Sequence, residues 1–174
     1  MDKFEELASS RPTIHIIFIH QNIPGHFGGL LLDGDIYIND HLESREKYQV
    51  LHEEFAHYDY TVGDISQYSD CSDCKQERLA RSVAMMRAVT LDGLIYCYEH
   101  DLWTSQDIAD YFGVTEKYLY QAIINYRTKY GLLFKHGGYW FDLRQTINWS
   151  SPKCWCKLNS ANLSFHKLKH TGFF

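Results

Sequence analysis

The stretch Leu51–Tyr58, LHEEFAHY, decides how the rest of the chain is interpreted. Its two histidines, His52 and His57, lie five residues apart, whereas the zinc-binding helix motif H-E-x-x-H needs a separation of four. At about 100° per residue, the two imidazoles point roughly 140° apart on a helix and do not easily share one ion. Glu53 and His57 are four residues apart and only about 40° from each other. A carboxylate therefore stands where the motif has its first histidine.

The residues around this stretch predict an amphipathic helix over about 43–60. Four apolar or aromatic side chains fall within about 80° of one another on a helical wheel, namely Tyr48, Leu51, Phe55 and Tyr58. Glu53 and His57 lie on the opposite edge, and Glu54 lies between the two faces. The helix is expected to bury one side and to present its acidic and imidazole groups on the other.

A metal site on this helix needs a further ligand from another element. Glu77 is the best candidate, because Ala80 and Ala84 follow it on a face small enough for two helices to approach closely. Zinc accepts carboxylate oxygen as well as imidazole nitrogen, and a site with Glu53, His57 and Glu77 would keep a fourth position open for water. Glu54 would then be the general base. The competing interpretation is a solvated acidic helix face that binds no metal.

The other elements predict an α+β fold, in which a small antiparallel sheet packs on the motif helix and a mostly helical half follows. Residues 13–21 are typical of a strand, and residues 28–39 of two strands joined by a tight turn at Asp33-Gly34. A long helix is expected over 75–100, broken near Asp92-Gly93. We expect three regions: a domain at 1–100 that carries the motif helix, a helical region with a closing hairpin through Gly137-Gly138 at 101–149, and a tail of uncertain structure at 150–174.

The composition limits the classes of partner. The net charge is -5 and the isoelectric point is near 6.0, so the chain has no general attraction for nucleic acid or for anionic membranes. No run approaches 18 apolar residues, and the start, MDKFEELASS, is charged where a signal peptide is apolar. We expect a cytoplasmic protein with reduced thiols. Four of its cysteines have spacings that would also suit a structural zinc knot, namely Cys71, Cys74, Cys154 and Cys156.

Residues 105–124, SQDIADYFGVTEKYLYQAII, have the pattern of a helix-turn-helix with its turn at Gly113. A helix that reads DNA is expected to begin with Arg, Lys, Asn or Gln. Here the second helix begins with Thr115, Glu116 and Lys117, a mixed surface. A scaffold or a surface that docks another protein is therefore favoured over DNA binding.

An ordered set of segments resembles the ImmA/IrrE family of metallopeptidases, in particular the branch found in phages and prophages. The segments are GGLLLDGDIYINDHL, REKYQVLHEEFAHY, TVGDI, KQERLARSVA and SQDIADYFGVTEKYLYQAIINYRTKYG, within about residues 13–131. The resemblance implies a zincin-like peptidase with one zinc ion. Glu53 and His57 match the motif helix, Glu54 the general base and Glu77 the glutamate of the next helix.

The resemblance also implies a partner, a phage-type repressor that the protein would cleave or antagonise. Two classes of function remain open: a zinc endopeptidase that cuts the repressor, and a binding module that sequesters it without cutting. A DNA-binding regulator is a third. Turnover separates the first two, because a protease acts on many partner molecules and an antagonist on one.

Overall fold

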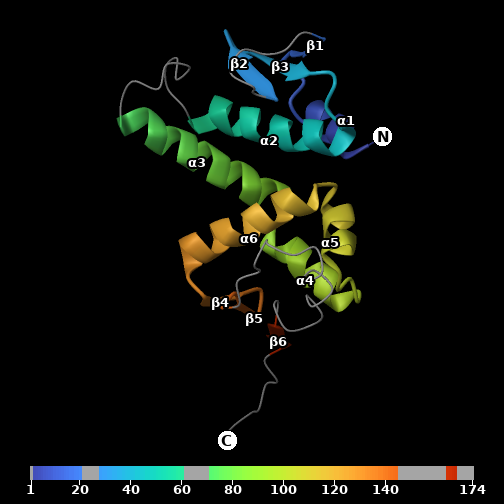
Figure 1. Ribbon diagram of the computed structural model, residues 1–174, viewed down its shortest axis with the longest axis vertical. Helices are drawn as coiled ribbons and strands as arrows, with labels where there is room; N and C mark the ends of the chain where they lie inside the picture. Colours follow the sequence, from blue (N-terminus) through green and yellow to red (C-terminus); the bar gives the residue numbers. More distant parts are fainter. Residues whose placement is uncertain (1, 21–27, 61–70, 145–163, 168–174) are drawn as a thin grey trace, which may run out of the picture.

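The structure is a computed structural model that describes residues 2–20, 28–60, 71–144 and 164–167, without the side chains of 71–73 and 164–167. The first sheet lies over helix α2, and α3 leads from this part to a helical half with a second sheet (Figure 1). The expected α+β fold is confirmed. Among the described residues, no helix is long and apolar enough to cross a membrane.

The first sheet consists of β1 (Ile16–Ile19), β2 (Gly29–Leu32) and β3 (Asp35–Asn39), with β3 in the centre. β2 and β3 form the predicted hairpin. Asp33 and Gly34 have φ angles of 53° and 89°, as a two-residue turn of the favoured twist requires. β1 pairs with the other side of β3 in parallel, so the sheet is mixed rather than purely antiparallel.

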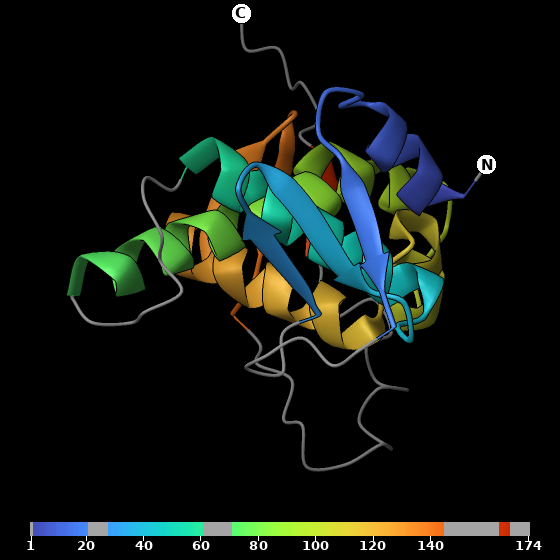
Figure 2. The same ribbon diagram turned by 90° about the horizontal axis from the view of Figure 1, so that it is seen from above.

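Helices α1 (Lys3–Ser9) and α2 (Ser44–Tyr60) cover one face of this sheet, and Figure 2 shows the strands crossing α2. Leu51 and Phe55 of α2 pack with Ile36 and Ile38 of β3 in a shared core. The predicted apolar stripe of α2 holds for Leu51 and Phe55, but Tyr58 is 49% exposed. The helix instead buries a wider arc, because the sheet and α3 contact it from different sides.

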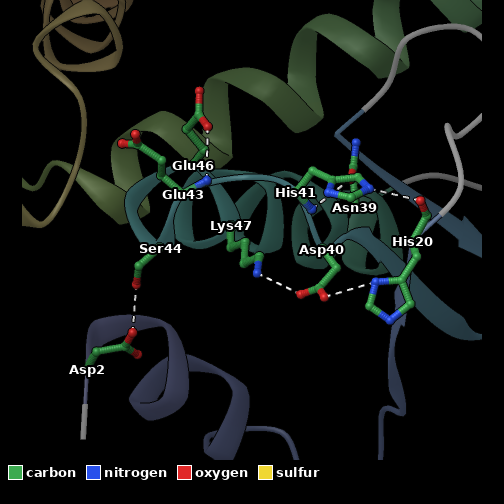
Figure 3. A network of polar contacts seen from close by, with 9 residues as sticks. All are labelled: Asp2, His20, Asn39, Asp40, His41, Glu43, Ser44, Glu46 and Lys47. Carbon is green, nitrogen blue, oxygen red and sulfur yellow. Dashed lines mark hydrogen bonds and ion pairs between the residues drawn. The ribbon is translucent and has the colours of Figure 1, made fainter.

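The start of α2 is fixed by contacts with the segments before it (Figure 3). The backbone N–H of Glu43 donates to the side chain of Glu46 at 3.1 Å, which satisfies a donor at the helix start. The Ser44 hydroxyl donates to the Asp2 carboxylate at 2.6 Å and so ties α2 to the N-cap of α1. These contacts fix the start of the helix on which the motif residues follow about two and a half to three and a half turns later.

Helix α3 (Cys71–Ala88) ends before α4 (Leu91–Glu99) begins, so the predicted break in the 75–100 helix lies slightly earlier than expected. Thr90 is the N-cap of α4, and its hydroxyl accepts the N–H of Gly93 at 3.1 Å. Gly93 has another role, since a Cβ there would lie 2.5 Å from Cε1 of Phe112. The glycine permits close packing of α4 against α5 rather than a break.

The remaining helices are α5 (Ser105–Phe112) and α6 (Glu116–Tyr130), with Gly113 in the left-handed conformation between them (φ 69°). The predicted helix-turn-helix shape is thus present, with Thr115 as the N-cap of α6. Helices α4, α5 and α6 share the larger core cluster with the end of α3. The Tyr126 hydroxyl donates to the Val89 carbonyl at 2.7 Å and fastens α6 to the α3–α4 junction.

A second sheet closes the helical half. It contains β4 (Leu133–His136), β5 (Tyr139–Asp142) and β6 (Ser164–Lys167), with β5 in the centre. The predicted hairpin turn at Gly137-Gly138 is confirmed by φ angles of 55° and 83°. β6 comes from the tail for which the sequence predicted no pattern, and it pairs antiparallel with β5. The side chain of Cys71, together with Cys154 and Cys156, lies outside the described residues; Cys74 is exposed on α3.

Candidate functional site

The motif helix passes very close to strand β2, and two glycines make this approach possible. A Cβ on Gly28 would lie 2.7 Å from Cγ2 of Val50, and a Cβ on Gly29 would lie 2.4 Å from Cγ1 of the same side chain. The same Gly29 Cβ would lie 2.9 Å from Oε1 of Glu54. The Gly-Gly pair therefore leaves the space beside β2 that the Glu54 carboxyl occupies.

Glu54 is almost fully buried in this space. Burial and, to a smaller extent, the nearby carboxylates of Glu53 and Glu77 together raise the pKa of its carboxyl to about 8, although a hydrogen bond from the Leu31 backbone opposes the rise. A carboxyl with so high a pKa can hold or release a proton near neutral pH, as a general acid or base must.

Helix α3 brings the second group of side chains to the site. Ala56 of α2 packs with Ala80 and Ala84 of α3 in a small buried cluster, as the spacing of the alanines predicted. Because these side chains are small, the helices lie close enough for His57 Nε2 to come within 3.2 Å of Glu77 Oε2. Both side chains are only partly accessible, with 15% and 17% of their areas exposed.

Arg81 joins the acidic groups on the α3 side. Its guanidinium donates to Glu77 Oε1 at 2.6 Å, one helical turn along. Burial raises the pKa of Glu53; the charge of Arg81 opposes this rise, and that of Glu77 adds to it. Burial lowers the pKa of His57, which keeps its imidazole neutral and so able to bind a metal. The site is thus a buried group of three carboxyls and one imidazole, with one guanidinium at its edge.

The donor atoms can be compared with a zinc site. Two ligands at about 2.0–2.1 Å from a tetrahedral zinc lie about 3.3 Å from each other, close to the separation of His57 Nε2 and Glu77 Oε2. Glu53 is on the same face, one turn before His57. Within the described ranges, however, no group of three or more His, Cys, Asp or Glu side chains is arranged to hold an ion. The imidazole and carboxylate groups present are of the types that bind zinc, and two of them, those of His57 and Glu77, already lie next to each other.

Two further buried side chains border the site. The Tyr118 hydroxyl of α6 is buried without a hydrogen-bond partner in the described part of the chain, and burial and the charge of Glu53 raise its pKa. His52 is also buried, and its ring packs edge-on against Tyr48 at 4.6 Å between centroids. Its Nε2 has no hydrogen-bond partner in the described part of the chain.

The fold and these groups define a class of protein, an α+β chain with a metallopeptidase-like motif helix. A family model described as the IrrE N-terminal-like domain (Peptidase_M78) matches residues 11–123, more than half of the chain. The chain belongs to this peptidase family, and the expected resemblance is confirmed. No curated protein and no solved structure gave a significant match.

Reasoning from the sequence missed three contributors to the site. Arg81 carries a visible signal, because it lies four residues after Glu77 on one helix face. Gly29 carries a weaker one, since paired glycines before an apolar run indicate a close backbone approach as readily as a loop. Tyr118 carries none, because it comes near Glu53 only through the folding of α6 against α2 and α3, where Gln49 of α2 donates to the Thr115 hydroxyl at the start of α6.

Proposed function

We propose that the chain is a zinc-dependent endopeptidase of a phage or mobile element that cuts a repressor-type protein and so relieves repression. Its membership of the peptidase family supports the peptidase activity. The observation that carries the proposal is the 3.2 Å contact between His57 and Glu77, which places two side chains of zinc-ligand type from separate helices beside the buried Glu54. The expected cytoplasmic location is part of the same proposal.

In this proposal Glu53, His57 and Glu77 hold the ion. Zinc, when bound, acts as a Lewis acid and makes bound water more acidic. Glu54 accepts a proton from the attacking water and returns it to the leaving amine, and its position beside Gly29 fixes the direction of its carboxyl. Arg81 would have to leave Glu77 or share it, since its guanidinium occupies Oε1.

The unusual ligand Glu53 has a consequence for rate. Two carboxylates and one neutral imidazole leave a divalent ion formally neutral, which weakens its effect on bound water. We expect Glu53→His to raise the net charge at the ion by one and to raise, or at least preserve, peptidase activity. The measurement is the rate at which each variant cleaves a purified repressor-type protein, together with the zinc content of each variant.

Glu54→Gln gives the decisive comparison. It removes the proposed base but no proposed ligand, so zinc content should be unchanged while cleavage falls by roughly 10²–10⁴-fold. Glu77→Ala is the matched ligand variant and should lower both zinc content and cleavage. A Glu54→Gln protein that still inactivates the repressor at the wild-type rate would rule out the peptidase mechanism.

The second candidate is an antagonist that binds the repressor without cutting it. The contact of Glu77 with Arg81 favours it, because the guanidinium pairs with a carboxylate that a peptidase would use as a ligand. An antagonist inactivates repressor in a fixed ratio and leaves it intact. The two candidates are separated by mixing one molecule of the protein with 100 molecules of repressor and measuring the repressor by mass spectrometry. A peptidase should convert most of the repressor to fragments, whereas an antagonist should leave it intact.

A further inference from the structure

A groove of about 520 Å³ runs between α3 and α6 and reaches the candidate site. Its α3 wall begins at Glu77, which also contacts His57. Its lining includes the cations Arg78, Arg81 and Lys129 and the apolar side chains Met85 and Ile124. From Glu77 to Met85 the helix rises about 12 Å, the length of about four residues of extended peptide.

The charge of the groove is opposite to that of the whole molecule. Three cationic side chains line it, Arg78, Arg81 and Lys129, against the single carboxylate of Glu77, in a chain whose net charge is -5. Arg81 is already paired with Glu77. Arg78 is exposed at the α3 wall, and Lys129 on α6 lies 3.3 Å from Met86 Sδ and is also exposed. Two cations are thus available to a ligand.

The groove also has an apolar lining. Met85 is buried at its base, while Ile124 is 40% exposed although it is a large apolar side chain. Below them the Asn125 side chain donates to the Ser82 carbonyl at 3.2 Å and holds the two helices together. A surface for nucleic acid combines many cations with aromatic side chains, whereas few cations around an apolar lining suit a peptide.

We propose that this groove binds an acidic segment of the protein substrate, about four residues long, with apolar residues between its carboxylates. The acidic side chains would pair with Arg78 and Lys129, and the apolar ones would contact Ile124 and Met85. The segment would enter the candidate site past Glu77. This inference rests on the proposed peptidase function for its orientation, but the binding itself requires no cleavage.

The test measures binding in the absence of turnover. The probe is a rhodamine-labelled peptide of alternating leucine and glutamate, seven residues long, titrated with Glu54→Gln protein and followed by fluorescence anisotropy. Arg78→Glu with Lys129→Glu should weaken binding at least tenfold, since each reversal removes one charge-assisted contact and adds repulsion. Lys117→Glu, which makes the same change of charge as either single reversal on an exposed part of α6, should change binding less than twofold, whereas Arg78→Glu alone and Lys129→Glu alone should each weaken it clearly more.

Three results would overturn the inference: equal weakening by Lys117→Glu, no weakening by the groove variants, or tighter binding of a peptide with lysine in place of glutamate. A single-stranded oligonucleotide that binds more tightly and displaces the peptide would also overturn it. Thermal melts of the variants, and the milder pair Arg78→Gln and Lys129→Gln, separate loss of contact from loss of fold. If the peptide binds in the groove but the repressor is not cleaved, the groove inference stands and the peptidase proposal fails. If the repressor is cleaved and the groove variants leave the rate unchanged, the peptidase proposal stands and the groove inference fails.

Discussion

Glu54 lies in a space that exists because residue 29 has no side chain. The carboxyl of Glu54 and the methyl groups of Val50 occupy the volume that a Cβ on Gly29 would need. A charged or protonatable group in so confined a position is held in one orientation, which a proton transfer requires. This arrangement restricts position 29 of β2 to glycine, because any larger residue there must displace Val50 or Glu54.

Gly29→Ala is therefore expected to destabilise the protein by about 1–3 kcal/mol, because the added methyl overlaps Cγ1 of Val50 and Oε1 of Glu54. The free energy of unfolding in urea measures this. In a Val50→Ala background the same substitution should cost less, since one of the two overlaps is gone. Equal costs in the two backgrounds would show that the strand moves away from the helix instead.

His52 should give the molecule a measurable dependence on pH. Burial and, to a smaller extent, the charge of Arg87 together lower the pKa of its imidazole from 6.5 to about 4. Between these values the unfolded chain binds more protons than the folded one, so stability falls as the pH falls from about 6.5 toward 4. The full effect is on the order of 2–3 kcal/mol.

The measurement is the free energy of unfolding from pH 7.5 to 4.5, for the wild type and for His52→Leu. The variant lacks the titrating group, so the wild type should lose stability relative to it as the pH falls. Taking the difference removes the contributions of other groups that titrate equally in both proteins. A difference that stays constant across this range would contradict the assigned burial of a neutral imidazole.

Of the residues at the candidate site, the sequence pointed to those whose spacing carries the information. Glu53 and His57 are related by one helical turn, and Glu77 precedes two alanines on one face. Arg81 and Gly29 were visible but ambiguous. Tyr118 is more than sixty residues from Glu53 in the chain, and the packing of two distant helices is a long-range property that no local pattern encodes.

At the scale of elements, the turns were the most predictable features. Asp33-Gly34 and Gly137-Gly138 need backbone conformations with positive φ, and few residues other than glycine, asparagine and aspartate adopt them readily. The parallel pairing of β1 was not predictable in the same way, because a strand has similar side-chain periodicity in either direction. The β6 strand was missed because no turn signal links it to a strand next to it in the sequence, as Gly137-Gly138 links β4 to β5.

Substitution of Gly93 can show whether this glycine weakens helix α4 or allows α4 to pack closely against α5. If the glycine only weakened α4, Gly93→Ala would stabilise the protein by about 1 kcal/mol. The structure predicts the opposite sign, because the new methyl would lie 2.5 Å from the Phe112 ring, and such overpacking costs about 1–3 kcal/mol. Thermal unfolding of Gly93→Ala measures the sign. In a Phe112→Leu background, the alanine should become neutral or favourable.

At the scale of the whole molecule, two separate cores meet through α3. One core joins the first sheet to α2, the other joins α4, α5 and α6 to β5, and the small cluster of Ala56, Ala80 and Ala84 lies where α3 contacts α2. The ion pairs of Asp59 with Arg11 and Arg87, each at 2.7 Å, fix the same junction. The candidate site lies across this junction, so its geometry depends on how the helices meet.

Ala84→Leu tests that dependence. The added carbons must separate α2 from α3, and we expect this to lower the free energy of unfolding by about 1–3 kcal/mol. Zinc binding should weaken at least tenfold, because His57 and Glu77 would then lie too far apart to bind the same ion. Isothermal titration with zinc and urea unfolding measure the two effects. Ala84→Ser, which adds almost no volume, is the control. Unchanged zinc affinity in Ala84→Leu would show that the two side chains do not bind the ion together.

The bond from Tyr126 to Val89 also bears on how the protein can be divided. The family match ends at residue 123, within α6, whereas the hydroxyl that holds the α3–α4 junction comes three residues later. A fragment cut at the family boundary would carry every proposed ligand and yet lose the last turns of α6, with the buried faces of its neighbours uncovered. The region shared with relatives is therefore smaller than the region that must fold, and fragments for crystallisation or library screening need to extend at least through β5.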